Sequence, residues 1–126
     1  MRYLVDTTFV IDHLRGDAAA RQRMAQLVGE GDELNVNEVV VAESWTGART
    51  DDDPDLDVFL RFLEFVQPAP RSAKLAGRWR ADARRRGWTL SMTDALIAAA
   101  AEGLGAVILT RNRRDFAFTP IRVETY

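Results

Sequence analysis

Four acidic side chains in this sequence stand beside apolar segments, where a charge is costly to bury unless something pairs with it. They are Asp6, Glu43, Asp94 and Asp115. Asp6 ends the apolar run at residues 3–5, and Asp94 opens an alanine-rich segment. Carboxylates that crowd together repel one another, so either one of them is protonated or a cation lies between them. A cluster of three or four carboxylates without His or Cys suits Mg²⁺ or Mn²⁺ and not Zn²⁺.

A magnesium ion held by a few carboxylates keeps bound water and open positions. It can then orient a phosphodiester, activate water and stabilise the leaving oxygen. Basic side chains near the site would hold a nucleic-acid backbone, and Arg111, Arg113 and Arg114 are candidates. Residues 71–86 carry seven basic residues against one acid and are a second candidate, although a solvated helix face explains them equally well.

The elements that must position these side chains follow from the hydrophobic pattern. Helices are predicted over residues 8–15, 18–30, 38–48, 56–65, 72–86 and 93–102. Strands are predicted over residues 3–5, 33–36, 106–109 and 121–124, and residues 66–68 are at best a short strand. Asn37 is a suitable N-cap for the third helix, although its valine run also favours a strand. Short apolar strands alternating with helices predict an α/β sandwich around a mostly parallel sheet of four to five strands.

In such sheets, ligands bind beyond the carboxyl ends of the strands. Asp6 lies at the end of the first strand, and Thr110, Asn112 and Asp115 follow the strand at residues 106–109. Two strands are therefore expected to deliver polar groups to one edge of the sheet. Asp94 has a simpler interpretation as well, because an acid in the first turn of a helix often serves only the helix dipole.

Length and composition bound the remaining possibilities. With 126 residues, the chain is expected to form one domain over residues 1–126. It has no cysteine, which excludes a disulfide scaffold and a thiolate metal site. No apolar stretch reaches the roughly 18 residues of a membrane span, and the start is too short for a signal peptide. The expectation is a cytoplasmic protein with no membrane partner.

Four segments together resemble PIN-domain ribonucleases, and among these the VapC-type toxins of bacterial toxin–antitoxin pairs. They are residues 3–12, residues 41–43, residues 92–101 and residues 109–116. The resemblance implies a three-layer α/β/α fold and a metal-dependent endoribonuclease, for which the carboxylates suggest Mg²⁺ or, as an alternative, Mn²⁺. It also implies a homodimer that a VapB-type antitoxin holds inactive, alone or in a larger complex.

The resemblance also implies roles for individual residues. Asp6, Glu43 and Asp94 match the family's metal-binding acids, and Asp115 is ranked as a fourth. Thr7, Thr110 and Asn112 match polar residues that support the site. Some members of the family carry an acid where this chain has Asn112, and this neutral residue would weaken a second metal site.

Other interpretations remain open at this stage. A non-catalytic α/β module that binds nucleic acid or protein is one alternative. An aspartyl-phosphate enzyme is another, but Asp6 lacks the second Asp two residues later that such enzymes use. His13, the only histidine, is expected to be structural. A partner helix is expected to dock near Phe9, Trp45 and the helix at residues 56–65.

Overall fold

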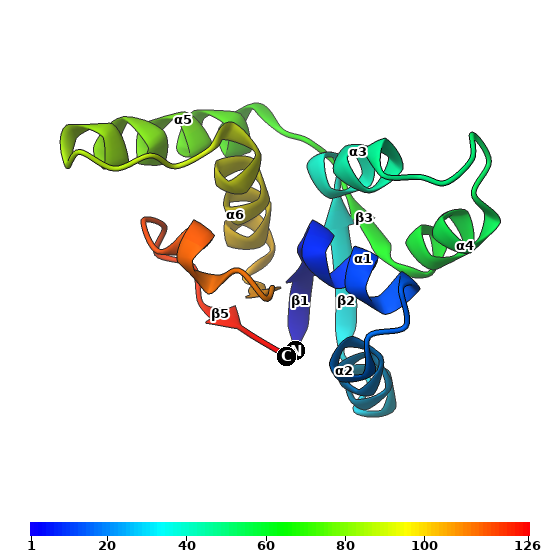
Figure 1. The fold of residues 1–126 in the computed structure, drawn as a ribbon. Helices are drawn as coiled ribbons and strands as arrows, with labels where there is room; N and C mark the ends of the chain where they lie inside the picture. The colour runs from blue at the N-terminus through cyan, green and yellow to red at the C-terminus, as the bar shows by residue number, and fades with distance from the viewer.

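Five short strands form one sheet in which every neighbouring pair is parallel, in the order β3-β2-β1-β4-β5. The computed structural model describes all residues 1–126 (Figure 1). The strands are β1 (Arg2–Val5), β2 (Glu33–Asn37), β3 (Glu64–Val66), β4 (Val107–Leu109) and β5 (Val123–Glu124). The helices are α1 (Thr7–Leu14), α2 (Ala18–Gly29), α3 (Glu38–Thr46), α4 (Pro54–Phe62), α5 (Pro70–Arg85), α6 (Met92–Leu104) and the 3₁₀ helix η1 (Arg113–Phe116).

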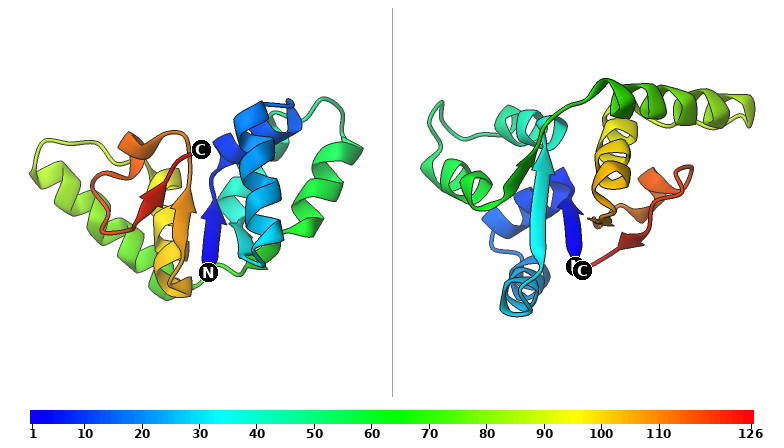
Figure 2. Two further views of the ribbon diagram at one scale, coloured as in Figure 1. Left: turned by 90° about the horizontal axis from the view of Figure 1, so that it is seen from below. Right: turned by 180° about the vertical axis from the view of Figure 1, so that it is seen from behind.

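The order of the strands explains the three layers. The chain moves from β1 through β2 to β3 and then returns across the sheet to β4. Because crossovers between parallel strands are right-handed, this reversal sends the later helices to the opposite face. Figure 2 shows α5 and α6 on one side of the strands and α1 to α4 on the other. The predicted α/β/α sandwich is confirmed, and the sheet has five strands.

The core lies between the sheet and these helices. Leu4, Val5, Ile108 and Leu109 from the two central strands are completely buried. A second, smaller cluster fills the contact between α5 and α6, where Ala76, Ala83, Ala95 and Ala99 let the two helices approach closely. The alanine-rich segment after Asp94 is therefore a packing surface.

Helix caps bring two of the acids into place. Asp6 is the N-cap of α1, and its side chain accepts a hydrogen bond from the backbone N–H of Thr7. Ser91 caps α6 by accepting from the backbone N–H of Asp94. Asn37 caps α3 as predicted, and the valine run is helical. The cap at Asn37 therefore favours a helix in a segment whose residue propensities alone do not distinguish a helix from a strand.

One predicted element is wrong at its end. A helix over residues 56–65 was expected, but α4 ends at Phe62 and residues 64–66 form β3. The cause is pairing with β2, in which Val36 lies opposite Phe65. Phe59 is buried, whereas Phe62 and Phe65 are 60% and 48% exposed, so only the first of them packs in the core.

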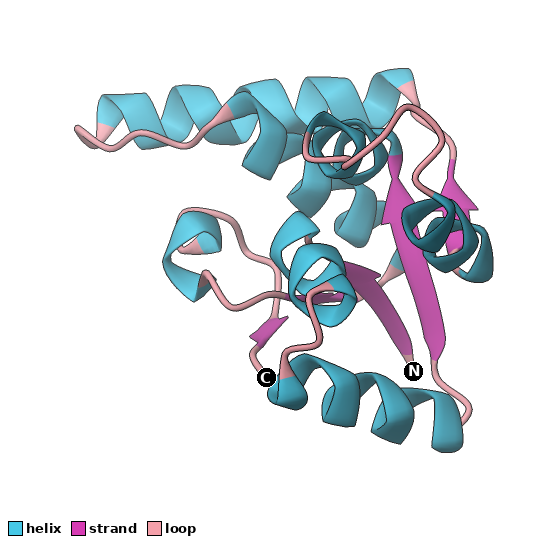
Figure 3. Ribbon diagram, turned by 45° about the vertical axis from the view of Figure 1, so that its right-hand side comes forward, coloured by secondary structure: helices cyan, strands magenta, loops and turns pink.

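Two further features concern the surface. No helix combines the length and the apolar character that crossing a membrane requires. Figure 3 shows α5 running along one side of the molecule, with one end reaching beyond η1. Most basic residues of the segment 71–86 are carried on this helix and are exposed to solvent.

Candidate active site

The centre of the candidate site is the edge where β1 and β4 end side by side. Val5 of β1 is in register with Leu109 of β4. Asp6 and Thr110 each come one residue later, and the Thr110 hydroxyl donates to Asp6 Oδ2 at 2.7 Å. The two strands are parallel, but the order in which the chain adds strands to the sheet reverses between them, and open α/β sheets bind their ligands at such a point. The expectation that two strands deliver polar groups to one edge is confirmed.

Asp6 is a buried carboxylate with three hydrogen-bond donors. Besides Thr110, it accepts from the Thr7 backbone N–H at 2.8 Å and from the Thr8 hydroxyl at 3.2 Å. Only 5% of the residue is exposed, and this burial raises the pKa of Asp6 above its ordinary value. The three hydrogen bonds act in the opposite direction, and the charge of Glu43 raises the pKa further. Asp6 is thus held rigidly while its negative charge is disfavoured.

Glu43 reaches the same place from α3. The Thr7 hydroxyl donates to Glu43 Oε1 at 2.8 Å, so one threonine contacts Asp6 with its backbone and Glu43 with its side chain. Glu43 is half-buried, and its second carboxylate oxygen, Oε2, is left for another partner. Thr7 thereby sets the spacing between two of the acids.

Asp94 lies in the first turn of α6 and is half-buried. The cap of this helix is Ser91, so the Asp94 carboxylate is not needed to end the helix. Burial raises the pKa of Asp94 to about 6, and the charges of Asp115, Asp6 and Glu43 contribute in that order. An acid in the first turn would ordinarily be stabilised by the helix dipole. Here burial, followed by the charges of three other carboxylates, raises the pKa instead.

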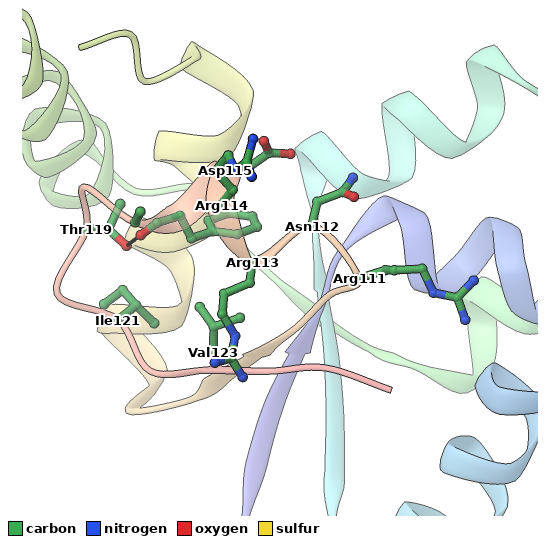
Figure 4. Close-up of a pocket in the computed structure, with 10 residues that line it drawn as sticks. Arg111, Asn112, Arg113, Arg114, Asp115, Thr119, Ile121 and Val123 are labelled. Carbon is green, nitrogen blue, oxygen red and sulfur yellow. Dashed lines mark hydrogen bonds between the residues drawn. The ribbon is translucent and has the colours of Figure 1, made fainter. Parts of the chain in front are cut away.

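The loop after β4 supplies the last two candidates. The Asn112 backbone N–H donates to the Thr110 hydroxyl at 3.0 Å, which fixes that hydroxyl toward Asp6. Asp115 lies on η1 and is exposed. Its charge is the largest electrostatic contribution to the raised pKa of Asp94. Figure 4 shows Asp115 and Asn112 on the same side of this loop.

Arg111 differs from its two arginine neighbours because it is fully engaged. It forms ion pairs with Asp17 at 2.9 Å and with Asp12 at 3.4 Å. Its guanidinium carbon lies 4.7 Å from the centre of the Tyr126 ring, and the Tyr126 hydroxyl donates to Asp12 at 2.8 Å. Figure 4 shows Arg111 leaving the loop away from Arg113. Arg111 therefore fastens the loop between Thr110 and Asn112 to α1 and α2.

Sequence reasoning missed Thr8. Its hydroxyl donates to Asp6 Oδ2 and lies 3.4 Å from the Thr110 hydroxyl. The signal was available, because a threonine two residues after an N-cap aspartate lies in the same first helical turn. His13 stacks on Phe59 with ring centres 4.6 Å apart, in agreement with a structural role. Asp12, farther along the same helix, pairs with Arg111.

The chemistry of the four acids suits a hard divalent cation. All the candidate ligand atoms are oxygens, and burial together with neighbouring carboxylates raises the pKa values of Asp6 and Asp94. No three His, Cys, Asp or Glu side chains lie close enough to form a complete cage. Magnesium does not require one, because it is commonly bound by one or two carboxylates and keeps its other ligands as water. The residues therefore fit the cation.

Thr110 offers a direct test of how Asp6 is held. Thr110→Val keeps the shape of this fully buried side chain but removes the donor to Asp6. The fold should lose about 2 kcal/mol of unfolding free energy, because a buried charged acceptor loses a partner. The matched control is Thr110→Ser, which keeps the hydroxyl. Urea unfolding of both variants checks the prediction, and equal stability of the two would contradict it.

A comparison with known protein families shows to which family this chain belongs. The model of the PIN domain family matches residues 3–120. A protein named Ribonuclease VapC19 from Mycobacterium tuberculosis is 33% identical over 117 residues, which cover 93% of this chain and 94% of the relative. The chain belongs to the PIN-domain family and, within it, to the VapC-type proteins.

More distant relatives agree. Ribonuclease VapC2 from Haemophilus influenzae is 27% identical over 122 residues, covering 92% of this chain and 90% of that protein. Among solved structures, VapBC2 from Rickettsia felis, bound to a DNA fragment from its promoter, superposes with a TM-score of 0.85 at 20% identity. The coverage is 100% of this chain and 99% of that one. VapBC from Salmonella typhimurium, also bound to DNA, gives a TM-score of 0.83 at 23% identity over 99% of this chain and 98% of that one. These likenesses support the fold.

Proposed function

We propose that this chain is the endoribonuclease toxin of a toxin–antitoxin pair and that it hydrolyses RNA phosphodiesters at the site of Asp6, Glu43, Asp94 and Asp115. The observation that carries the proposal is the hydrogen-bond network where β1 and β4 end, in which Thr7 joins Asp6 to Glu43 and Thr110 holds Asp6. Burial, followed by the charges of Asp115, Asp6 and Glu43, also raises the pKa of Asp94 to about 6. The curated relatives are named ribonucleases, which agrees with this chemistry.

VapC-type PIN-domain ribonucleases depend on a metal ion, and we propose that the ion here is Mg²⁺, with Mn²⁺ able to replace it. Asp6 and Asp94 would hold the ion, and Glu43 and Asp115 would contribute further negative charge. When bound, the cation polarises the phosphodiester and lowers the pKa of a water molecule, so no histidine base is required. His13, which packs on Phe59, is then free of any catalytic duty.

The side chains around the acids have separate tasks in this proposal. Thr110 and Thr8 fix Oδ2 of Asp6, and Thr7 fixes Oδ1 of Asp6 and Oε1 of Glu43. Rigid ligands lower the reorganisation that must accompany the reaction. Asn112 adds no charge, so it favours a single cation over two.

The requirement for a cation is tested by removing it. RNA cleavage by the purified chain should fall to background in EDTA and return on addition of excess Mg²⁺ or Mn²⁺. The measurement is a gel assay of total RNA, which also maps the cleavage positions. Cleavage that persists in EDTA would contradict the metal-dependent mechanism, and a chain that binds RNA but never cleaves it would favour the binding module.

We also propose that the partner is a VapB-type antitoxin and that the chain forms a homodimer or a larger complex with it. The solved relatives are themselves VapBC complexes. Phe9 is completely buried, so it offers no surface of its own to a partner. Beside the predicted helix, exposed apolar side chains line a hollow of about 510 Å³, including Val58 and Phe62 of α4.

The partner surface is tested by co-expression with the neighbouring reading frame. Val58 and Phe62 are 68% and 60% exposed, so Val58→Asp with Phe62→Asp should leave the fold intact. We expect the antitoxin to stop copurifying, because a charge opposes burial of this apolar surface. Val28→Asp, at an exposed position of α2, is the control. If the antitoxin still copurifies with both variants, it binds elsewhere on the molecule.

A further inference from the structure

Two hollows on the surface share a wall, and together they lead away from the candidate site. The first, of about 1030 Å³, is lined by the η1 loop, including Arg113, Arg114 and Asp115 (Figure 4). The second, of about 440 Å³, lies along α5 and is lined by Arg71, Lys74 and Arg78, among others. Segment 119–121 separates them, because Thr119 and Ile121 line the first and Pro120 lines the second.

The cations that line these hollows are unpaired. We call Arg113, Arg114, Arg71, Lys74 and Arg78 the basic path. All five are exposed, and none forms an ion pair with a carboxylate. Only two acids, Asp115 and Glu102, line the same hollows. Arg111, at the edge of the first hollow, is occupied by Asp12 and Asp17.

The grouping of these cations is a local feature. The formal net charge of the chain is −2, so the path is not the consequence of a basic protein. Some arginines elsewhere, such as Arg23 and Arg61, are matched by acids. Others, such as Arg84 and Arg86, form no ion pair but line neither hollow, so the path is distinguished by five unpaired cations along two adjoining hollows. A row of cations without counterions is costly through self-repulsion, which an anionic ligand relieves.

The walls of the hollows add an apolar component. Ile121 and Val123 line the first, and Leu75 and Trp79 line the second. Concave surfaces that combine cations with apolar and aromatic walls suit a single nucleic-acid strand, whose phosphates meet the cations while unstacked bases meet the walls. A duplex buries its bases and would use only the cations.

We propose that the basic path binds the phosphate backbone of single-stranded RNA that continues from the candidate site, past Arg113 and Arg114, over segment 119–121 to Lys74 and Arg78. The inference rests on the proposed function, since it assigns the route of the same substrate. It implies that the preferred substrate is a long single-stranded segment and that affinity far from the cut comes from α5.

The test is RNA binding measured by fluorescence anisotropy in EDTA, with labelled oligouridylates of about 6 and about 20 nucleotides. Lys74→Gln with Arg78→Gln removes two cations of the path and is compared with Arg84→Gln and Arg86→Gln. The latter pair belongs to the same basic segment and is exposed, but it lines neither hollow. Both double variants change the net charge equally, so a bulk charge effect would appear in both.

We expect the Lys74 and Arg78 variant to bind the longer RNA about tenfold more weakly, with the slope of log affinity against log salt reduced by about 1.4. The shorter RNA should lose less than about twofold, because it can occupy the first hollow alone. The control should bind both RNAs as the unaltered chain does. The proposal would be contradicted if the two double variants lost RNA affinity equally. It would also be contradicted if the Lys74 and Arg78 variant lost equal affinity for the short and the long RNA.

The result is independent of catalysis, because EDTA removes the divalent cation during binding. A chain that shows this length-dependent loss but never cleaves RNA would refute the proposed function alone. A chain that cleaves RNA but shows no difference between the two double variants would refute the basic path alone.

Discussion

Asp94→Asn is expected to lower the rate of RNA cleavage by about a thousandfold, which corresponds to about 4 kcal/mol of lost transition-state stabilisation. The amide keeps the size of the side chain but loses the charge that attracts the cation. Because Ser91 and not Asp94 caps α6, the helix itself should remain intact. Single-turnover cleavage of RNA in Mg²⁺ is the measurement.

The control for this prediction is Asp57→Asn, the same chemical change on α4, where Asp57 pairs only with Arg61 at the surface. It should cleave RNA at the rate of the unaltered chain. Asp6→Asn should also abolish cleavage, but with a loss of stability, because an amide oxygen that accepts from Thr110 and Thr8 leaves the NH2 group facing the Thr7 backbone N–H. Near-normal cleavage by Asp94→Asn would remove Asp94 from the site.

The same substitution should stabilise the protein when no cation is present. The folded-state pKa of Asp94 is about 6, above its ordinary value of 3.8, so the folded chain binds this proton more tightly than the unfolded chain does. Ionised Asp94 therefore opposes folding, and its contribution to stability is lost as the pH rises through about 6. Asn at this position has no charge to bury.

Thermal unfolding in EDTA measures this effect. At about pH 4 the two proteins should unfold at similar temperatures, and at about pH 7.5 Asp94→Asn should unfold about 4 °C higher. That shift corresponds to about 1 kcal/mol, allowing for the solvent that reaches a half-buried side chain. Excess Mg²⁺ should reverse the order, since only the unaltered chain binds it tightly. A temperature difference that does not change with pH would contradict the crowding of charge around Asp94.

Much of the site followed from local sequence signals. Asp6 after a buried strand and Thr110 after another were both recognisable, because an apolar run followed by a polar residue marks where a strand ends. The structure adds the register of Val5 with Leu109, which brings the two polar residues into contact. Register depends on pairing between residues about a hundred positions apart, and no local pattern encodes it.

The differences between the sequence predictions and the structure also arise from contacts between residues far apart in the sequence. Phe65 continued the apolar face of a helix, but pairing of β3 with β2 made it part of a strand. Arg111 was grouped with Arg113 and Arg114 as an RNA contact, yet its partners Asp12 and Asp17 lie far earlier in the chain. A long charged side chain takes the partner that folding brings near, which the sequence does not reveal. Thr8 was overlooked although its position two residues after the N-cap Asp6 places it in the same first helical turn.

The central claim is that Asp6, Glu43, Asp94 and Asp115 together bind the divalent cation on which RNA cleavage depends. Its most direct test is a crystal of the chain soaked in Mn²⁺, with the ion located by its anomalous scattering. The account predicts one strong peak in contact with carboxylate oxygens of Asp6 and Asp94, at about 2.1 Å, and no such peak in Asp94→Asn. A Mn²⁺ peak elsewhere on the molecule and none at these acids, in a protein that still cleaves RNA, would contradict it.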